Sequence, residues 1–356
     1  MRILAINPGS TSTKFSVFDN NELVLDQTVR HSTEEISKYP KILDQYEFRR
    51  DLIIKSMEEN HVLVSSLDAV VGRGGLLKPI PGGVYKVNDT LLEDLRKEMM
   101  GEHASNLGGI LAYEIAKLTG KNVDSFIVDP VVVDELQDLA RLSGHPELPR
   151  VSIFHALNQK AVARRYARET GAKYEDLSLI VAHLGGGITV GVHYKGKVID
   201  VNNGLDGEGP YSPERSGTLP AGALAKLCYA KKYQLVEVRK MITGRGGMVA
   251  YLGTNSAMDV EKRTKEGDKE AERIYKGIAY QVAKEIGACS AVLSGKVDAI
   301  LITGGLAYSD ILTKWISERV EFISKVCIYP GEDETRALAE SVFFAINGEQ
   351  EIKVYN

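Results

Sequence analysis

The chain repeats one pattern of strands and loops in its two halves. Each copy has a strand, a loop of small residues, a second strand, a polar turn and a third apolar run. In the first copy the two strands are 2–6 and 13–18, the loop between them is 7–12, and the third run starts at Leu23. In the second copy the two strands are 179–182 and 188–194, the loop between them is 183–187, and the third run is 198–201. A pattern that recurs in the same order indicates a duplicated unit. We therefore predict two related α/β domains, each with one ligand-binding loop.

The composition of both loops suits them to bind phosphate. Glycine tolerates positive φ and close backbone approach, so several N–H groups can converge on one anion. Hydroxyls and a lysine complete the first loop, and a histidine lies near three glycines in the second. The residues predicted to bind phosphate are Ser10, Thr11, Ser12, Lys14, His183, Gly185, Gly186 and Gly187. A single glycine-rich loop between strands is more often only the turn of a hairpin. Two such loops at corresponding positions of the repeat favour binding of a nucleotide triphosphate in a cleft.

Length and charge narrow the class of protein. At 356 residues the chain exceeds what one hydrophobic core usually serves, so two domains are expected. Its 44 basic and 48 acidic residues leave a formal charge of −4, which argues against nucleic-acid binding. Cys228, Cys289 and Cys327 are too widely spaced to predict a disulfide framework or a zinc site. No apolar stretch is long enough to span a bilayer, so we expect no membrane association and a cytoplasmic location.

Helices and strands alternate after each hairpin. In the first half we predict helices at 46–60, 88–100 and 103–118, and strands at 69–71 and 125–128. In the second half we predict helices at 221–230, 270–293, 309–322 and 333–345, and strands at 299–302 and 326–329. Thr90 and Glu93 have capping-box spacing near the start of their helix. No low-complexity linker separates the halves, so the hinge must be short.

Four ordered motifs lead from this pattern to a family. They are Asn7 to Lys14 (Asn-x-Gly-Ser-x-Ser-x-Lys), His103 to Leu107 followed by Gly109, His183 to Gly187, and Glu214 to Gly217 with its Arg-Ser-Gly. In these motifs, and over essentially its whole length, the chain resembles the superfamily of acetate and sugar kinases, heat-shock chaperone ATPases and actin. Within that superfamily it resembles the acetate kinase branch, most closely the butyrate kinases.

The resemblance implies a duplicated ribonuclease-H-like, or actin-like ATPase, fold. The expected domains are 1–154, with a returning C-terminal helix at about 333–356, and 155–332, with a nucleotide cleft between them. The implied activity is transfer of the γ-phosphoryl group of ATP to butanoate, giving ADP and butanoyl phosphate with Mg²⁺ present. Acetate, propionate and branched-chain acids remain alternative substrates. Relatives suggest a homodimer or a larger homo-oligomer.

A carboxylate that accepts a phosphoryl group needs no catalytic base, because its pKa of about 4 leaves it ionised at neutral pH. Repulsion between two anions is the obstacle, so positioned cations are required. By resemblance these are Arg73 and Arg215, which bind the carboxylate and the transferred group, with His103 also at the substrate. The alternative is that each arginine pairs with a surface carboxylate.

Two further residues acquire catalytic roles from the resemblance. His155 corresponds to a histidine that stabilises the in-line transition state, although a histidine after an apolar strand is more often a hydrogen-bonded core residue. Asp129 follows a strand at the edge where open α/β sheets place ligands, and its counterpart is a carboxylate near the metal. Its alternative role is the N-cap of a helix at 131–136, with Pro130 at the first helical position.

The resemblance also assigns the metal and the nucleotide. Asn7 and a glutamate before the last helix contact Mg²⁺; among Glu332, Asp333 and Glu334 we select Glu334. Gly304 and Gly305 form a strand-to-helix turn similar to the adenosine motif of the superfamily. The family's aspartate and arginine near 256–258 are absent, which puts adenine contacts there in doubt.

Around Arg73 the His-Arg-x-x-His pattern of acetate kinases is absent, and this chain has Gly72-Arg73-Gly74-Gly75 in its place. We hypothesise that the smaller residues beside Arg73 leave room for an acyl chain longer than acetate.

Three classes of protein other than a carboxylate kinase are alternatives. A sugar kinase would use Asp129 as a base; a chaperone or actin-like ATPase needs no paired arginines; a DNA-binding repressor would need a helix-turn-helix and zinc cysteines that the chain lacks.

Overall fold

The computed structural model describes residues 1–98, 101–230 and 232–356, which form two compact units. Unit 1 comprises Met1–Val133 and Asp333–Asn356, and unit 2 comprises Asp134–Glu332. The C-terminal segment thus belongs to the same unit as the first strand. The units divide at Val133, so residues 134–154, expected in the first domain, lie in unit 2.

Unit 1 is built on a seven-stranded sheet with the order β12-β5-β6-β4-β1-β2-β3. Its strands are β1 (Arg2–Pro8), β2 (Ser12–Asp19), β3 (Glu22–Arg30), β4 (Ala69–Arg73), β5 (Val84–Lys86), β6 (Asp124–Val128) and β12 (Ile352–Val354). Its helices are α1 (Thr33–Ile36), α2 (Tyr46–Glu59), α3 (Asp89–Lys97), α4 (Asn106–Leu118) and α13 (Glu334–Ile346), with 3₁₀ turns η1 (Leu43–Gln45) and η2 (Val64–Ser66). β1, β2 and β3 pair antiparallel, whereas β4 and β6 continue the sheet parallel to β1.

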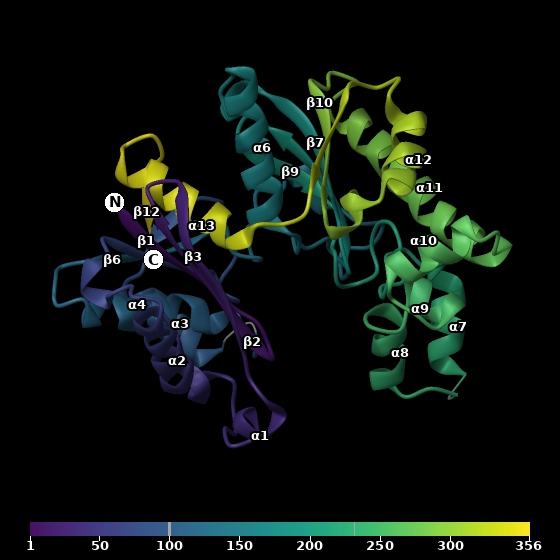
Figure 1. Cartoon of the computed structure of the whole chain (residues 1–356). Helices are drawn as coiled ribbons and strands as arrows, with labels where there is room; N and C mark the ends of the chain where they lie inside the picture. Colours follow the sequence, from purple (N-terminus) through teal and green to yellow (C-terminus); the bar gives the residue numbers. More distant parts are fainter. Residues whose placement is uncertain (99–100, 231) are drawn as a thin grey trace. The chain divides into compact units, whose positions relative to one another are not determined.

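Helices cover both faces of this sheet (Figure 1). α4 packs against β1, β4 and β6, with α2 and α3 beside it, and α13 packs on β1 and β4 from the opposite face. Apolar side chains of β1 and β2, including Leu4, Ile6 and Phe15, form one core with Ile53 of α2 and Leu111 of α4. Burial of these side chains fixes the ends of β1 and β4, where the polar residues of the candidate site lie.

Unit 2 has a five-stranded sheet with the order β11-β10-β7-β8-β9. Its strands are β7 (Ser178–Leu184), β8 (Ile188–Tyr194), β9 (Lys197–Val201), β10 (Ala299–Gly304) and β11 (Val326–Pro330). Its helices are α5 (Asp138–Arg141), α6 (Ala156–Thr170), α7 (Ala221–Tyr229), α8 (Leu235–Ile242), α9 (Gly247–Leu252), α10 (Ala257–Lys265), α11 (Lys269–Val292) and α12 (Asp310–Val320), with 3₁₀ turns η3 (Tyr174–Asp176) and η4 (Gly305–Tyr308).

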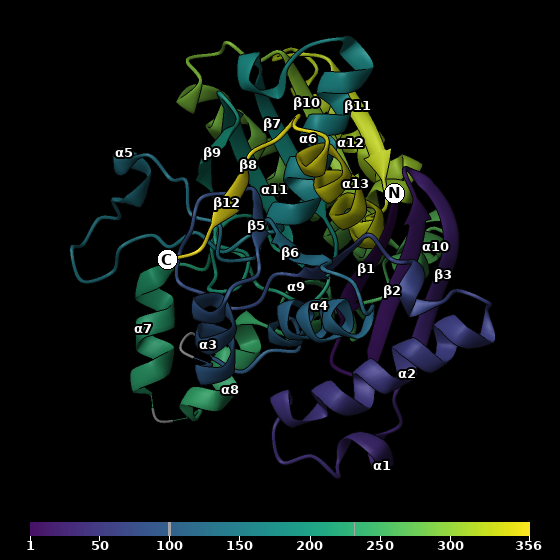
Figure 2. The same ribbon diagram turned by 90° about the vertical axis from the view of Figure 1, so that its left-hand side faces the viewer.

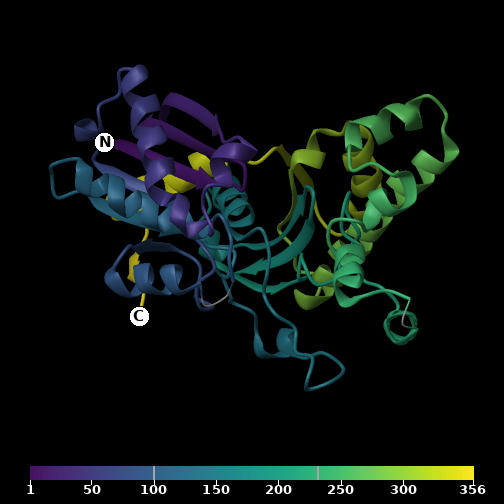
Figure 3. The same ribbon diagram turned by 90° about the horizontal axis from the view of Figure 1, so that it is seen from below.

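The sheet of unit 2 also lies between helices. α6 packs on β7 and β10 through Ala163 and Tyr166, while α11 and α12 cover the other face (Figure 1). The segment around α5 lies at the β9 edge of this sheet (Figures 2 and 3), where the Gln137 N–H bonds the Ile199 carbonyl, and its Leu139 is 77% exposed. None of the described helices is both long and apolar enough to cross a membrane.

The two sheets share one plan, which confirms the duplication that the sequence predicted. β3-β2-β1-β4-β6 in unit 1 and β9-β8-β7-β10-β11 in unit 2 each have three antiparallel strands followed by two parallel strands. This is the ribonuclease-H-like arrangement. The predicted helix at 88–100 ends at Lys97, and Met99 and Met100 lie outside the described residues. Its N-cap is Asn88, which accepts from the Leu91 N–H, so the capping box expected from Thr90 is wrong.

Candidate active site

The loop between β1 and β2 is held by a buried arginine of α2. Arg49 is fully buried, and its guanidinium donates to the carbonyls of Gly9 (2.7 Å), Ser10 (3.1 Å) and Ser12 (3.2 Å). Among the described residues no carboxylate pairs with it, and burial lowers its pKa to about 10. The loop carbonyls bind this side chain, and Ser10 and Thr11 are exposed residues. Arg49 was not predicted as a site residue from the sequence, although its four-residue spacing from Ile53, and that of Ile53 from Met57, places it on the buried face of α2.

At the ends of β1 and β4, an amide, a guanidinium and a carboxylate meet within unit 1. The amide nitrogen of Asn7 donates to Glu334 Oε2, and Arg73 Nη1 lies 3.0 Å from the same oxygen. Arg73 also donates to Asn7 Oδ1 at 3.4 Å. The partner of Arg73 is therefore a mostly buried carboxylate that starts α13, not a surface group.

The three acidic residues before α13 have different surroundings. Glu334 contacts Asn7, whereas Asp333 caps α13 by accepting from the Arg336 N–H at 3.2 Å. Glu332 Oε2 lies 3.6 Å from His183 Nε2 in unit 2. Only Glu334 shares a site with Asn7, and their two oxygen donors match the hard ligands and partial hydration that Mg²⁺ prefers. No cluster of three or more His, Cys, Asp or Glu side chains suited to a metal occurs in the described parts of the chain.

Asp129 and His103 also belong to unit 1. Asp129 is buried with φ +36°, a strained value for a non-glycine residue, and its Oδ1 accepts from the Gly83 N–H at 2.7 Å. No helix follows at 131–136, so the N-cap alternative for Asp129 is wrong. The His103 imidazole bonds Ser105 Oγ at 2.7 Å, and desolvation together with the charge of Arg73 lowers its pKa.

The glycines beside Arg73 do not open space for a ligand. A side chain at Gly72 would collide with the Gly108 carbonyl of α4, and one at Gly74 would meet Pro130 at 2.5 Å. A side chain at Gly75 would approach the Asn106 backbone at 2.6 Å. These glycines let β4 and its loop pack against α4, so the hypothesis that they make room for a longer acyl chain is wrong.

In unit 2, two histidine rings stack at the start of α6. The imidazoles of His155 and His183 have centroids 3.8 Å apart and planes inclined by 13°. His155 Nδ1 bonds Thr189 Oγ1 at 2.9 Å, and the buried His183 bonds Asn158 Oδ1 at 2.8 Å. Each ring is thus oriented by its own partner on α6 or β8.

The glycine loop of unit 2 packs directly on Arg215. A side chain at Gly187 would collide with the guanidinium, whose Nη1 donates to the Gly204 carbonyl at 2.6 Å. Ser212 Oγ donates to the Gly186 carbonyl at 2.5 Å and accepts from the Arg215 N–H, which ties the two loops together. Arg215 Nε is buried without a hydrogen-bond partner, and burial lowers the pKa of the guanidinium. Such an arrangement leaves a cation beside the loop with no carboxylate bond among the described residues.

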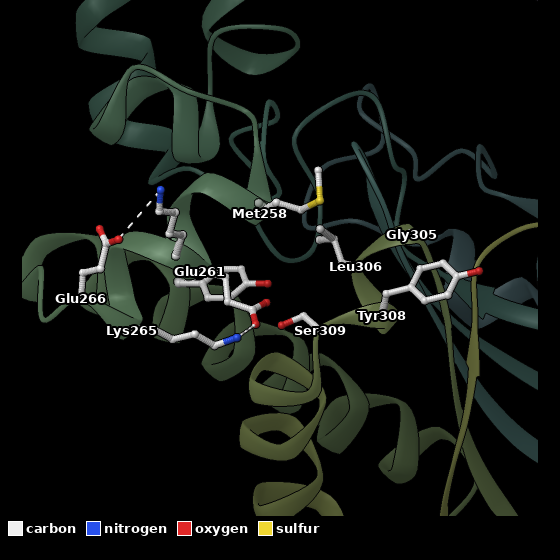
Figure 4. Close-up of a pocket in the computed structure, with 11 residues that line it drawn as sticks. Met258, Glu261, Lys265, Glu266, Gly305, Leu306, Tyr308 and Ser309 are labelled. Carbon is white, nitrogen blue, oxygen red and sulfur yellow. Dashed lines mark hydrogen bonds and ion pairs between the residues drawn. The ribbon is translucent and has the colours of Figure 1, made fainter.

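A pocket of about 680 Å³ opens where α10 faces η4 (Figure 4). Met258 and Leu306 reach toward each other across it, and Gly305 lines one side with open space at its Cβ position. Lys265 bonds Glu261 at 2.6 Å at its margin. Gly304 has φ +92° and packs on the Leu184 carbonyl, so only glycine fits there. The pocket therefore lies between the Gly304–Gly305 turn and Met258. Met258 belongs to the segment 256–258, which lacks the aspartate and arginine of acetate kinases.

Two ribonuclease-H-like units with a small-residue loop in each define a protein of the acetate and sugar kinase, chaperone and actin superfamily. Comparison with known proteins specifies the family. The pattern of the acetokinase family matches residues 149–314. Butyrate kinase 2 of Clostridium acetobutylicum is 57% identical over 354 residues, 99% of this chain and 99% of that protein. The chain belongs to the acetokinase family.

Solved structures show the same fold at low sequence identity. The crystal structure of Porphyromonas gingivalis acetate kinase aligns with a TM-score of 0.75 and 17% identity, covering 96% of this chain and 98% of that chain. A propionate kinase from Francisella tularensis aligns with a TM-score of 0.71 and 17% identity, covering 95% and 98% of the two chains.

Proposed function

We propose that the protein transfers the γ-phosphoryl group of ATP to a short-chain carboxylate, with butanoate as the preferred acid. Membership of the acetokinase family and 57% identity to a protein named Butyrate kinase 2 support the reaction and the acid. The structural observation that carries the proposal is the convergence of Asn7, Arg73 and Glu334. It supplies two oxygen donors for a metal and one guanidinium for an anion within unit 1.

Each unit offers groups for the nucleotide. In unit 1, Ser10, Thr11, Ser12 and Lys14 would contact phosphate oxygens, while Asn7 and Glu334 would hold Mg²⁺, which neutralises phosphate charge when bound. In unit 2, His183 and the glycines at 185–187 would contact phosphates. The pocket beside Gly305 has the size and apolar lining expected for an adenine base.

The reaction needs positioned charge and no base. The acid enters ionised, so Arg73 and Arg215 offset the repulsion between its carboxylate and the phosphoryl group, and His103 adds a polar contact at the acid. His155 donates to the transferred group in the in-line transition state. Asp129, held by the Gly83 N–H, would serve as the fixed carboxylate near the Mg²⁺.

An acid panel tests this proposal directly. The protein, MgATP and hydroxylamine are incubated with acetate, propionate, butanoate or isobutanoate, and acyl phosphate is measured as hydroxamate; ADP release is followed with glucose and glycerol. Butanoate is expected to give the highest kcat/KM. Equal or better turnover of acetate would refute the butanoate preference, and ADP release with sugars but not acids would refute carboxylate phosphorylation.

Arg215→Lys adds a test of the site. Its turnover is expected to fall on the order of a hundredfold, because one charge-stabilising donor is lost or displaced. Arg273→Lys is the matched control, since Arg273 forms an exposed ion pair with Glu270 on α11. Near-normal turnover of the Arg215 variant would exclude it from catalysis.

A further inference from the structure

A buried chain of hydrogen bonds runs through unit 2 and ends at His155. Its members, from the far end, are Tyr174, His193, Gln159, Thr189 and His155. The four links are Tyr174 Oη to His193 Nδ1 (2.8 Å), His193 Nε2 to Gln159 Oε1 (3.1 Å), Gln159 Nε2 to Thr189 Oγ1 (2.8 Å) and Thr189 Oγ1 to His155 Nδ1 (2.9 Å). Gln159, Thr189 and His193 are fully buried, so their bonds are not shared with bulk water.

Two glycines make this chain possible. Thr189, Gly191 and His193 alternate onto one face of β8, and a side chain at Gly191 would collide with Gln159 Oε1. The amide of Gln159 therefore reaches between Thr189 and His193 only because position 191 has no side chain. On the other side, the Thr189 methyl packs where a Cβ at Gly204 would lie, which turns the Thr189 hydroxyl toward His155.

The orientation of the Gln159 amide follows from the Thr189 backbone. Gln159 contacts the carbonyl oxygen of Thr189 at 3.0 Å, and a carbonyl can only accept. The contacting group must therefore be the NH₂, which also donates to Thr189 Oγ1. Oε1 then faces His193 Nε2, so that nitrogen carries a proton.

The two ring nitrogens of His193 have opposite hydrogen-bonding roles. Complete burial and the nearby charges of Lys160 and Arg164 hold its pKa well below the ordinary value, so the ring is neutral. With a proton on Nε2, its Nδ1 has a lone pair and accepts from the Tyr174 hydroxyl. Every donor and acceptor between Tyr174 and Gln159 is thereby assigned.

The last link decides the state of His155. The buried Thr189 hydroxyl accepts from the Gln159 NH₂, and among the described residues its only other hydrogen-bond contact is His155 Nδ1, so its proton is directed at that nitrogen, which is then the unprotonated one. We propose that Gln159 and Thr189 are positioning residues that fix His155 as the neutral tautomer with its proton on Nε2. This inference rests on the proposed function for its catalytic consequence, since an Nε2–H group is the donor that a phosphoryl oxygen requires.

Nitrogen NMR of ¹⁵N-histidine-labelled protein tests the tautomer without any assay of turnover. The His155 signals are identified by their loss in His155→Gln. In the wild type, His155 Nδ1 is expected at the shift of an unprotonated ring nitrogen and Nε2 at that of a protonated one. Thr189→Val removes the hydroxyl at nearly constant volume and is expected to average the two shifts, whereas Thr189→Ser retains the wild-type pattern. An unchanged pattern in Thr189→Val would overturn the proposal.

Kinetics measure the consequence. Thr189→Val and Gln159→Met are expected to lower kcat on the order of tenfold with little change in KM, as is usual when a partner that orients a functional histidine is removed. Thr189→Ser should restore most of kcat. Thr313→Val is the matched control, because the hydroxyl of this buried threonine of α12 donates to the backbone carbonyls of Ser309 and Asp310 at the start of the same helix. When His155 is already replaced by glutamine, Thr189→Val should cause no further loss of kcat. A tenfold loss in that background would show that Thr189 does not act through His155.

The two measurements separate this inference from the proposed function. If the panel of acids yields no acyl phosphate but the NMR pattern responds to Thr189→Val, the tautomer assignment holds and the proposed reaction fails. A wild-type spectrum with Nδ1 protonated refutes the assignment even in an active kinase. Thermal unfolding of each variant beside Thr313→Val shows that the spectra come from folded protein.

Discussion

Arg49 Nη1 donates to the Gly9 carbonyl at 2.7 Å, although the two residues lie 40 positions apart in the sequence. The same guanidinium reaches the carbonyls of Ser10 and Ser12. A loop that binds phosphate through N–H groups and hydroxyls must direct its carbonyls elsewhere, since carbonyl oxygens repel anions. Arg49 offers these carbonyls a buried cation, so it shapes the loop from within the unit.

Arg49→Met should therefore weaken both the fold and nucleotide binding. The partly buried loop carbonyls lose three bonds to a charged donor, and each such bond contributes roughly 1.5–3 kcal/mol, so a loss of at least about 3 kcal/mol in unfolding free energy is expected. Urea denaturation measures this loss, and the KM for MgATP should rise. Arg50→Met is the control, because Arg50 pairs with Asp51 at the surface. Equal stability of the two variants would contradict the role of Arg49.

His31 should make unit 1 sensitive to acid. Burial, with a smaller contribution from the charge of Arg49, lowers the pKa of His31 to about 4. A lowered pKa means that the neutral ring is favoured in the folded state. The contribution of neutral His31 to the free energy of unfolding is fully present above the unfolded pKa of about 6.5. It declines as the pH falls and is lost near the folded pKa of about 4, a total loss of about 3 kcal/mol.

The comparison with His31→Gln isolates this titration from that of the carboxylates. Glutamine can still accept from the Thr13 hydroxyl, which bonds His31 Nε2 at 2.9 Å in the wild type. Urea midpoints at pH 7, 5.5 and 4 should fall more steeply for the wild type than for the variant. Parallel curves would show that His31 does not titrate in this window.

The spacing of apolar residues along the sequence predicted most of the strands and the longer helices. The duplicated hairpins, α2 and α11 were predicted from sequence within a residue or two at each end, and Asp268 caps α11 by accepting from the Glu270 and Ala271 N–H groups. α6 was missed, although Gly171 ends it with φ +68°. Its buried face includes Asn158, Gln159 and Lys160, so polar residues occupy positions that a search for apolar period rejects.

The candidate site was less accessible to sequence reasoning. Motif residues such as Asn7 and Glu334 were identified by resemblance, and the structure brings these two together. Residues that act from behind them, such as Arg49 and Gln159, belong to no short motif. Their contacts join segments 30 or more positions apart, and only the packed structure reveals such pairs.

Glycines of this chain should differ sharply in tolerance of alanine. A methyl group at Gly72 would enter the Gly108 carbonyl where β4 crosses α4, so Gly72→Ala should cost 3 kcal/mol or more, roughly the upper range for overpacking. Gly287, inside α11, has nothing within 4 Å of its Cβ position. Gly287→Ala should stabilise the protein by about 0.5–1 kcal/mol through helix propensity. Similar melting temperatures for the two variants would contradict this packing.

Metal dependence should single out one of three neighbouring carboxylates. Glu334→Gln removes the charge beside Asn7, so the Mg²⁺ concentration for half-maximal activity is expected to rise about tenfold or more. Asp333→Asn should leave that concentration unchanged, because asparagine also caps a helix. Glu332→Gln, whose partner in the structure is His183, should likewise leave it unchanged. A larger Mg²⁺ shift in either control than in Glu334→Gln would reassign the metal ligand to that residue.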